Sequence, residues 1–548
     1  MSPLGFHQLF LLQNIMFLST FAANVLVTTP WSDSIVYPNI LLDIASLLAD
    51  DGHKVTFLAL QPDKEIPDNI TYLVGNFSTE NEISIKGTEY LHKIAETSGA
   101  LAGSSSRLIT QSIVGTYRAL EENIEQLKIR FDYLMSKEVA DVLREGNFSL
   151  IIAEETAFHP VALQTRRLMK QRLDQISQIP MITVLSIADQ HRSRVEQNLP
   201  TLLTSEAGQF FNLDNPNKPP DFISRLTALW DIGKFARQVL PRILSLFTRY
   251  LEEAGLESLI ELDNMTSLYL VNDHPALSFP NLAPPNSVNI ASLNFKSPTK
   301  LPQQIIKFTE KCRNYNVVLV TLEEIAYKSK LNNLYRTVGQ LVIESLRKEK
   351  SCAIVQKLPP QLNNNLTLSP ENFPLEDLLG SGIISFFICQ CGNRERILGT
   401  LYQVPMLCVP LFADQFSNSV SVVRNHFGAM LIREDISEET ARQAIRNIFE
   451  QREKMRANQA RAASVVLGDP HGSRESVLFY CNYLLKFGNA AYLKNDVIKK
   501  QGIVQVYNLD VLGLFSIVLV TIVCIFLMVL RACCRYFGMM MQKKFKSD

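Results

Sequence analysis

The sequence predicts two doubly wound α/β domains followed by a C-terminal membrane helix. Near the N-terminus, the apolar runs 24–29 and 55–60 flank an amphipathic segment, 38–49, which is the pattern of a βαβ unit. In residues 386–430, an apolar run, a turn, a helix-like segment and a second short apolar run repeat that pattern. The chain has 548 residues, too many for one hydrophobic core, so two domains are expected.

Residues 1–22 are predicted to be a signal peptide. An apolar middle precedes small residues at Thr20 and Ala22, which suit a cleavage site. A core helix is the alternative, because the segment lacks a positively charged start and is interrupted by Gln13 and Asn14. A predicted strand begins directly after the segment, and this favours the signal peptide.

The first domain is expected over residues 23–290. Its opening helix, 38–49, should end at Gly52, because glycine suits the position after a helix. The segment 83–144 is predicted to be mostly helical. Apolar positions around Leu226 form either a core face, which we favour, or a surface helix that touches a membrane. Further buried strands are predicted at 149–153, 180–185 and 268–272.

The second domain is expected over residues 300–490, after a proline-rich connector at 275–285. Its strongest unit is the stretch 386–430, in which polar groups follow the ends of apolar strands. Ligands bind at such strand ends in open α/β sheets, and a helix N-terminus there favours anions. The other predicted elements are a strand at 317–320 and helices at 331–347, 394–403 and 438–466.

The uncharged apolar run 511–530 is long enough to span a bilayer as a helix. Basic residues dominate the tail 531–548, so the tail should be cytosolic and the domains lumenal, in a single-pass type I topology. Lys544 and Lys546 resemble a dilysine retrieval signal, which predicts the endoplasmic reticulum membrane. A solvated basic tail is the alternative.

Asn-x-Ser/Thr triplets fit a lumenal placement, because such triplets are acceptors for N-glycosylation. They lie at Asn69, Asn76, Asn147, Asn264 and Asn365. Of the nine cysteines, none precedes Cys312, and the spacing does not suggest a disulfide framework. Cys389 and Cys391 flank the first turn of the stretch 386–430. We expect them to be buried small hydrophobic residues rather than metal ligands, and no metal site is predicted.

Composition argues against a nucleic-acid partner. The formal net charge is zero, the basic residues are dispersed, and no stripe combines basic with aromatic side chains. Apolar residues make up 47% of the chain and charged residues 20%, which is ordinary for a globular protein.

Several residues in the stretch 386–430 match a known signature. They are Asp414, Gln415 and Asn418, with residues 404–405 and 410–412. The stretch resembles the UDP-glycosyltransferases, in particular the membrane-bound animal branch that includes the glucuronosyltransferases. The family pattern has His-Gly-Gly at the first turn, where this chain has Gln390-Cys391-Gly392.

The resemblance implies a GT-B fold, two Rossmann-like domains with a cleft between them. A UDP-sugar would bind the C-terminal domain and a small lipophilic acceptor the N-terminal domain. In the family, a His acts as the base and an Asp orients it. Tyr37 and Ala157 occupy these two positions here. Tyrosine is a poor base near neutral pH, since its ordinary pKa is ~10. His159 is a possible substitute base, with a solvated or capping role as its alternative.

The implied donor site also departs from the family. Asn372 replaces the Trp that stacks on uracil, and Leu375 replaces a Gln. Glu323 and Glu324 stand in a phosphate-binding loop that normally carries glycine. The candidate UDP-sugar-binding residues are Gln390, Gly392, Arg394, Asp414, Gln415 and Asn418, with Arg394 as the possible compensation for lost phosphate contacts.

Two functions therefore compete. The first is an active transferase that moves a sugar from a UDP-sugar co-substrate to a lipophilic acceptor, with no other cofactor. The second, favoured by the lost motifs, is a catalytically inactive relative that binds hydrophobic ligands or partners an active paralogue. A homo- or hetero-oligomer with related transferases is compatible with either function.

Overall fold

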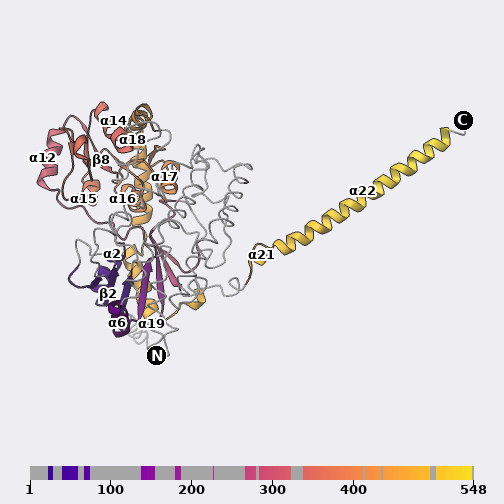
Figure 1. Ribbon diagram of the computed structural model, residues 1–548, viewed down its shortest axis with the longest axis horizontal. Helices are drawn as coiled ribbons and strands as arrows, with labels where there is room; N and C mark the ends of the chain where they lie inside the picture. Colours follow the sequence, from indigo (N-terminus) through magenta and orange to yellow (C-terminus); the bar gives the residue numbers. More distant parts are fainter. Residues whose placement is uncertain are drawn as a thin grey trace, which may run out of the picture. The chain divides into compact units, whose positions relative to one another are not determined.

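The computed structural model describes residues 22–28, 40–59, 67–74, 137–154, 179–186, 226, 266–278, 283–322, 337–411, 414–432, 436–493 and 501–545. Within these residues, two parallel sheets carry helices (Figure 1). A separate C-terminal unit contains the last two helices. The predicted α/β class, with two doubly wound sheets, is confirmed.

The first sheet has the order β3-β2-β1-β4-β5-β6-β7, and every neighbouring pair is parallel. The strand order reverses between β1 and β4, which makes this the switch point of the sheet. The strands are β1 (Asn24–Thr28), β2 (Lys54–Ala59), β3 (Thr71–Val74), β4 (Leu150–Glu154), β5 (Met181–Leu185), β6 (Thr266–Val271) and β7 (Ser287–Asn289).

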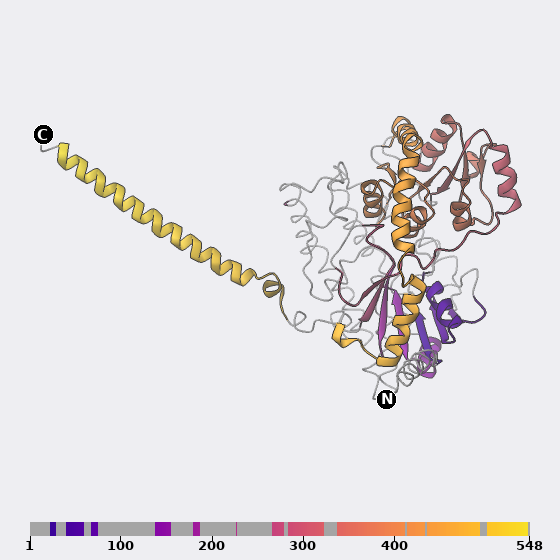
Figure 2. The same ribbon diagram turned by 180° about the vertical axis from the view of Figure 1, so that it is seen from behind.

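Helices α2 (Ile40–Asp50), α6 (Lys137–Glu145) and α19 (Ser473–Phe487) accompany the first sheet (Figure 2). The apolar face of α2 packs with β1 and β4 in one core. Val477, Cys481 and Leu484 of α19 are fully buried in that same core. Helix α19 therefore packs with the first sheet, although its place in the sequence lies inside the range 300–490 expected for the second domain.

The second sheet has the order β10-β9-β8-β11-β12-β13 and is also parallel throughout. Its switch point lies between β8 and β11. The strands are β8 (Asn316–Thr321), β9 (Ser351–Val355), β10 (Thr367–Leu368), β11 (Phe386–Cys389), β12 (Met406–Cys408) and β13 (Gly428–Met430).

Strand β11 is buried on both faces, as its unbroken apolar sequence predicts. Phe386 and Ile388 pack into one core with α14 and α18, whereas Phe387 and Cys389 pack into a second core with α12 and α16. The helices are α12 (Gln303–Lys311), α14 (Val338–Lys348), α15 (Leu375–Gly380), α16 (Asn393–Leu401), α17 (Gln415–Arg424) and α18 (Glu438–Leu467), with single 3-10 turns at Pro360–Leu362 and Ala491–Leu493.

The cysteine prediction is wrong for four residues. Cys312, directly after α12, forms a disulfide with Cys352 on β9, and Cys391 forms one with Cys408 on β12. The parallel strands bring these residues together across separations of 40 and 17 positions, which spacing alone does not reveal. Cys389 and Cys481 are free and buried, as expected for small hydrophobic side chains.

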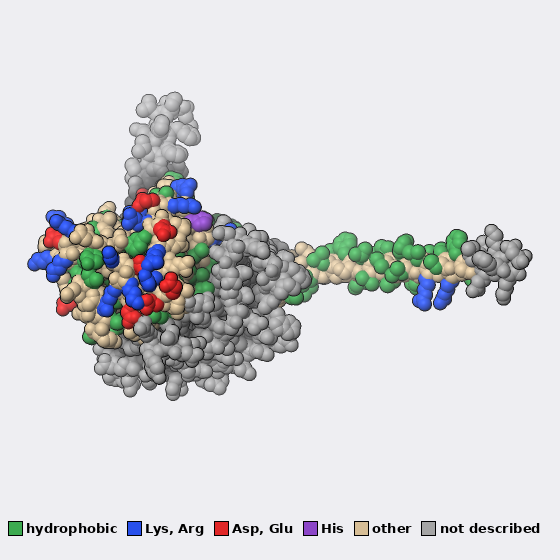
Figure 3. Space-filling model, turned by 90° about the horizontal axis from the view of Figure 1, so that it is seen from above, with side chains coloured by type: hydrophobic (Ala, Val, Ile, Leu, Met, Phe, Trp, Pro, Cys, Tyr) green, Lys and Arg blue, Asp and Glu red, His purple; other side chains and the backbone are tan. Residues whose placement is uncertain are grey.

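The C-terminal unit contains α21 (Ile503–Val506) and the long helix α22 (Leu509–Phe545). The most apolar 18-residue window within Leu509–Met539 of α22 has a mean hydropathy of 3.0, and none of this window is buried by protein. Figure 3 shows apolar side chains along this helix and basic ones towards its far end, where Arg531 and Arg535 lie. The helix is long and apolar enough to cross a membrane, as the run 511–530 predicted.

Several predictions lie outside the described residues. These are the signal peptide over residues 1–21, most of the helical segment 83–144, and the first part of the helix predicted at 331–347.

Candidate functional site

The candidate site lies at the carboxyl ends of β8, β11 and β12, beside the switch point of the second sheet. Strand β11 ends at Cys389, and the turn through Gln390, Cys391 and Gly392 leads into α16. Strand β12 ends at Cys408, and α17 begins at Gln415. Because parallel strands align their carboxyl ends, the polar residues after each strand meet at one edge of the sheet.

The two glutamines form the centre of this edge. Gln415 Nε2 donates to Gln390 Oε1 at 3.1 Å, and the Leu411 N–H donates to Gln415 Oε1 at 2.9 Å. These bonds fix the orientation of both amides. Gln390 Nε2 is then buried without a hydrogen-bond partner among the described residues. A buried amide donor without a partner costs free energy, so it is available to a ligand oxygen.

Asp414 and Asn418 extend the site along the first turn of α17. Asn418 Nδ2 donates to Asp414 Oδ2 at 2.8 Å, and Asn418 is only 2% exposed. The structure therefore brings together Gln390, Asp414, Gln415 and Asn418, all of which were predicted from the sequence as site residues.

Glu395 is a site residue with a strongly raised pKa, and the sequence interpretation missed it. Its Oε1 accepts a short hydrogen bond from Thr321 Oγ1, at the end of β8. Its Oε2 accepts the Gly392 N–H at 3.0 Å, so the side chain caps the amino end of α16. Burial raises the pKa of this half-buried carboxyl to about 7, although both hydrogen bonds act in the opposite direction.

A signal for this cap was present in the sequence. In a capping box, a glutamate three residues after the N-cap accepts the N-cap N–H, and Gly392 and Glu395 have that spacing. Gly392 has no side chain, so only the glutamate half of the box forms. The carboxylate thus lies where the positive end of the α16 dipole favours an anion.

Comparison with known proteins identifies the family to which the chain belongs. The sequence profile described as "UDP-glucoronosyl and UDP-glucosyl transferase" matches residues 235–546, which is more than half of the chain. The chain belongs to this family. The match includes the whole strand–turn–helix unit that carries Gln390, Glu395, Asp414 and Gln415.

Individual relatives are distant. UDP-glucuronosyltransferase 3A2 of Homo sapiens is 24% identical over 491 residues, which cover 86% of each protein. UDP-glycosyltransferase UGT4 of Dactylopius coccus is 24% identical over 322 residues, which cover 54% of this chain and 61% of that protein. A sequence identity of 24% does not by itself establish that this chain has the activity of a relative.

Solved structures agree on the fold. Os79 from O. sativa, in complex with U2F and trichothecene, superposes with a TM-score of 0.51 at 14% identity. The superposition covers 84% of this chain and 100% of Os79. The GT-B arrangement implied by the resemblance is therefore confirmed.

Arg394 does not stand free beside the site of this UDP-glycosyltransferase relative. Its guanidinium forms a short ion pair with Glu376 in the first turn of α15. Its role as a phosphate ligand stays a prediction, and a ligand would have to compete with Glu376. Phe373, which follows Asn372, is partly buried and packs against the apolar core.

The predicted base and its orienter lie outside the described residues. This holds for Tyr37, Ala157 and His159, and also for Glu323 and Glu324 in the phosphate loop. Among the glycosylation triplets, Asn69, Asn147 and Asn365 are exposed, whereas Asn76 and Asn264 lie outside the described residues.

Helix α16 also connects the two sheets through what we call the α16 joint. Arg396 is fully buried, and its Nη2 lies 2.7 Å from Asp273 Oδ1. Asn393 Nδ2 donates to two backbone oxygens beyond β5 and β6. The joint comprises Asn393 and Arg396 on α16 with Ser186, Asn272, Asp273 and Leu277 beyond the first sheet.

Proposed function

We propose that this chain is a membrane-attached UDP-glycosyltransferase relative that does not transfer sugar at neutral pH. It would act instead by binding a hydrophobic ligand or by partnering a related transferase. The observation that carries the proposal is the Glu395 carboxylate, which caps the amino end of α16 at the edge where a diphosphate would bind.

Electrostatics gives this observation its weight. An ionised carboxylate ~5 Å from a phosphate charge costs roughly 3 kcal/mol at an effective dielectric of ~20. Glu395 also engages the Gly392 N–H and the Thr321 hydroxyl, two donors that a diphosphate would otherwise use. The Glu395 carboxylate thus occupies the amino end of α16, where a phosphate group would otherwise bind.

The catalytic positions point in the same direction. Tyr37 and Ala157 stand where the family has the base and its orienting Asp. Loss of a general base typically lowers a rate ~10²–10⁴-fold. A weakened donor site and a missing base therefore act together against transfer.

An active transferase is the second candidate, and one observation favours it. Gln390 Nε2 is a buried donor without a partner among the described residues, directly beside the intact Asp414 and Gln415. In this case the protein transfers a sugar from a UDP-sugar to a small lipophilic acceptor. Protonation of Glu395 in mildly acidic conditions would open the site, since its pKa is about 7.

The experiment uses the full-length protein in detergent. UDP, UDP-glucose and UDP-glucuronate are titrated by calorimetry at pH 7.5, and acceptor-dependent UDP release is measured with a panel of lipophilic alcohols and acids. We expect weak donor binding and no acceptor-dependent release. Turnover that is lost in Asp414→Ala and Gln415→Ala would overturn the proposal in favour of the active transferase.

We further propose that α22 anchors the protein in the endoplasmic reticulum membrane with its sheets in the lumen. The apolar window of α22 and the exposed Asn69, Asn147 and Asn365 support this placement. Endoglycosidase should shift the mobility of the expressed protein, and Asn→Gln at these three positions should reduce the shift. The lumenal placement would be contradicted if the protein carried no glycan and if protease added outside intact microsomes digested the two-sheet region.

A further inference from the structure

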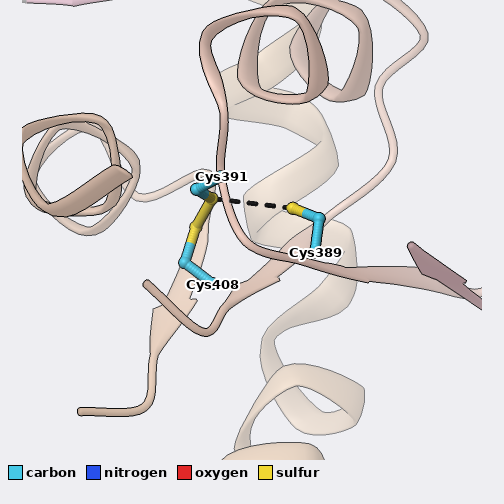
Figure 4. Close-up of side chains that lie close together, drawn as sticks. All are labelled: Cys389, Cys391 and Cys408. Atoms are coloured by element: carbon cyan, nitrogen blue, oxygen red, sulfur yellow. Dashed lines mark hydrogen bonds between the residues drawn. A yellow bond between two sulfur atoms is a disulfide. The ribbon is translucent and has the colours of Figure 1, made fainter. Parts of the chain in front are cut away.

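Three cysteines form a compact sulfur cluster beneath the first turn of the candidate site (Figure 4). The parallel register places Cys389 on β11 directly opposite Cys408 on β12. Cys391 follows two residues later with a φ of 58°, and the turn directs its side chain back to the same point. All three side chains are fully buried.

The cluster has the dimensions of a metal site. Its three Sγ atoms lie within 4.8 Å of one another, and Cys389 Sγ lies 3.6 Å from Cys391 Sγ. Thiolates bound to one metal at ~2.3 Å stand roughly 3.8 Å apart. Opening of the Cys391–Cys408 disulfide would let its two sulfurs separate to about that distance.

We propose that Cys389, Cys391 and Cys408 form a redox-gated site for one soft metal ion, which binds after a thiol reductant opens the Cys391–Cys408 disulfide. The donor set consists of sulfur alone, and sulfur donors select soft ions such as Cu(I) or Zn²⁺ over Mg²⁺ or Ca²⁺. The proposal is independent of whether the protein transfers sugar.

The chemistry balances in two steps. Two thiol groups of the reductant supply two electrons and two protons, so Cys391 and Cys408 become thiols while the reductant becomes a disulfide. A divalent ion then displaces one proton from each of the three thiols, which release three protons to solvent. The resulting trithiolate complex carries one negative charge.

The surroundings explain why metal is needed to hold the thiolates. Burial raises the pKa of the Cys389 thiol well above its usual value, and the Glu395 carboxylate raises it further. Without a cation, this thiol stays protonated and is a poor nucleophile. A bound divalent cation offsets two of the three thiolate charges, so the buried thiolates persist only while the metal is bound.

The test uses full-length protein in which the exposed Cys524, Cys533 and Cys534 are replaced by Ser. After anaerobic reduction with dithiothreitol and its removal, Cd²⁺ is titrated while ultraviolet thiolate-to-metal charge-transfer absorbance is recorded. We expect one Cd²⁺ per chain with this absorbance, and none in the oxidised protein. Cys389→Ser should weaken binding at least tenfold, whereas the matched buried control Cys481→Ser should leave it unchanged.

Near-UV circular dichroism of the reduced protein and of both variants checks that the fold persists. Equal Cd²⁺ binding before and after reduction would overturn the proposal, and so would unchanged binding in Cys389→Ser. Reduction that unfolds the chain before metal binds would overturn it as well, because the site must exist in the folded protein.

Discussion

Helix α16 presents two polar regions that differ in how their charged groups are paired. In the α16 joint, Arg396 and Asn393 are buried and hydrogen-bond to Asp273 and to backbone oxygens beyond the first sheet, although Arg396 Nε has no partner among the described residues. At the donor edge, Gln390 keeps an unpartnered amide and Glu395 has a raised pKa. A buried arginine paired with a buried carboxylate is typical of a structural joint, whereas carboxyls with perturbed pKa values gather at functional sites.

The largest expected effect is at the joint. Arg396→Met should lower the free energy of unfolding by ~3–5 kcal/mol, because it leaves the buried Asp273 carboxylate without its cation. Urea denaturation followed by circular dichroism measures this value. The double variant Arg396→Met/Asp273→Leu should recover much of the loss. A single variant as stable as the parent would mean that the joint does not hold the two sheets.

The second prediction concerns Asn393. Asn393→Ala removes donors to the backbone oxygens of Ser186 and Asn272 and should cost ~1–3 kcal/mol of unfolding free energy. Asn425→Ala is the matched control. Its amide makes only longer contacts, of 3.3 and 3.5 Å, to the same side of the molecule. Equal losses of unfolding free energy in Asn393→Ala and Asn425→Ala would contradict the greater contribution of the Asn393 hydrogen bonds.

The third prediction concerns the pH dependence of stability. The folded pKa of Glu395, about 7, lies above the ordinary value of 4.5, so the folded chain retains a proton that the unfolded chain releases. The resulting stabilisation is complete below the ordinary pKa and is lost as pH rises through 7. It amounts to at most ~3 kcal/mol for a half-buried group. In Glu395→Gln, the unfolding free energy should change less between pH 5 and pH 8 than it does in the parent. An equal pH dependence in the two proteins would contradict the raised pKa of Glu395.

The smallest effect is expected at Arg394. Its ion pair with Glu376 is partly exposed, so Arg394→Gln should change the unfolding free energy by less than ~1 kcal/mol. Donor affinity, measured by calorimetry with UDP-glucose, should also stay unchanged. A clear loss of affinity would show that Arg394 leaves Glu376 to bind the diphosphate.

Local patterns made most of the fold predictable. Apolar runs bounded by turn residues located β1, β2, β8 and β11, because most residues of each strand are buried. The return of α19 to the first sheet was not predictable in this way, since it depends on Val477 and Cys481 meeting a core built from distant residues. The disulfides were missed for the same reason.

Within the site, the residues that family resemblance named, Gln390, Asp414, Gln415 and Asn418, lie together at one edge of the sheet. Their role as UDP-sugar ligands stays a prediction. The resemblance gave no role to Glu395, whose pKa depends on burial and on Thr321 from another strand. The state of Arg394 likewise depends on Glu376, a partner from a helix earlier in the chain. Charges and pKa values follow from distances in space, so they could not be read from spacing in the sequence.

The most direct test of this role of the Glu395 carboxylate is the affinity for UDP-glucose as a function of pH, measured by calorimetry on the full-length protein and on Glu395→Gln. UDP-glucose suits this test because its diphosphate does not titrate between pH 6 and pH 8. We expect the parent to bind UDP-glucose up to about tenfold more tightly at pH 6 than at pH 8, the limit set by one carboxyl with a pKa of about 7. The variant should bind at both pH values about as tightly as the parent does at pH 6. Identical affinities and pH profiles in the two proteins would contradict it.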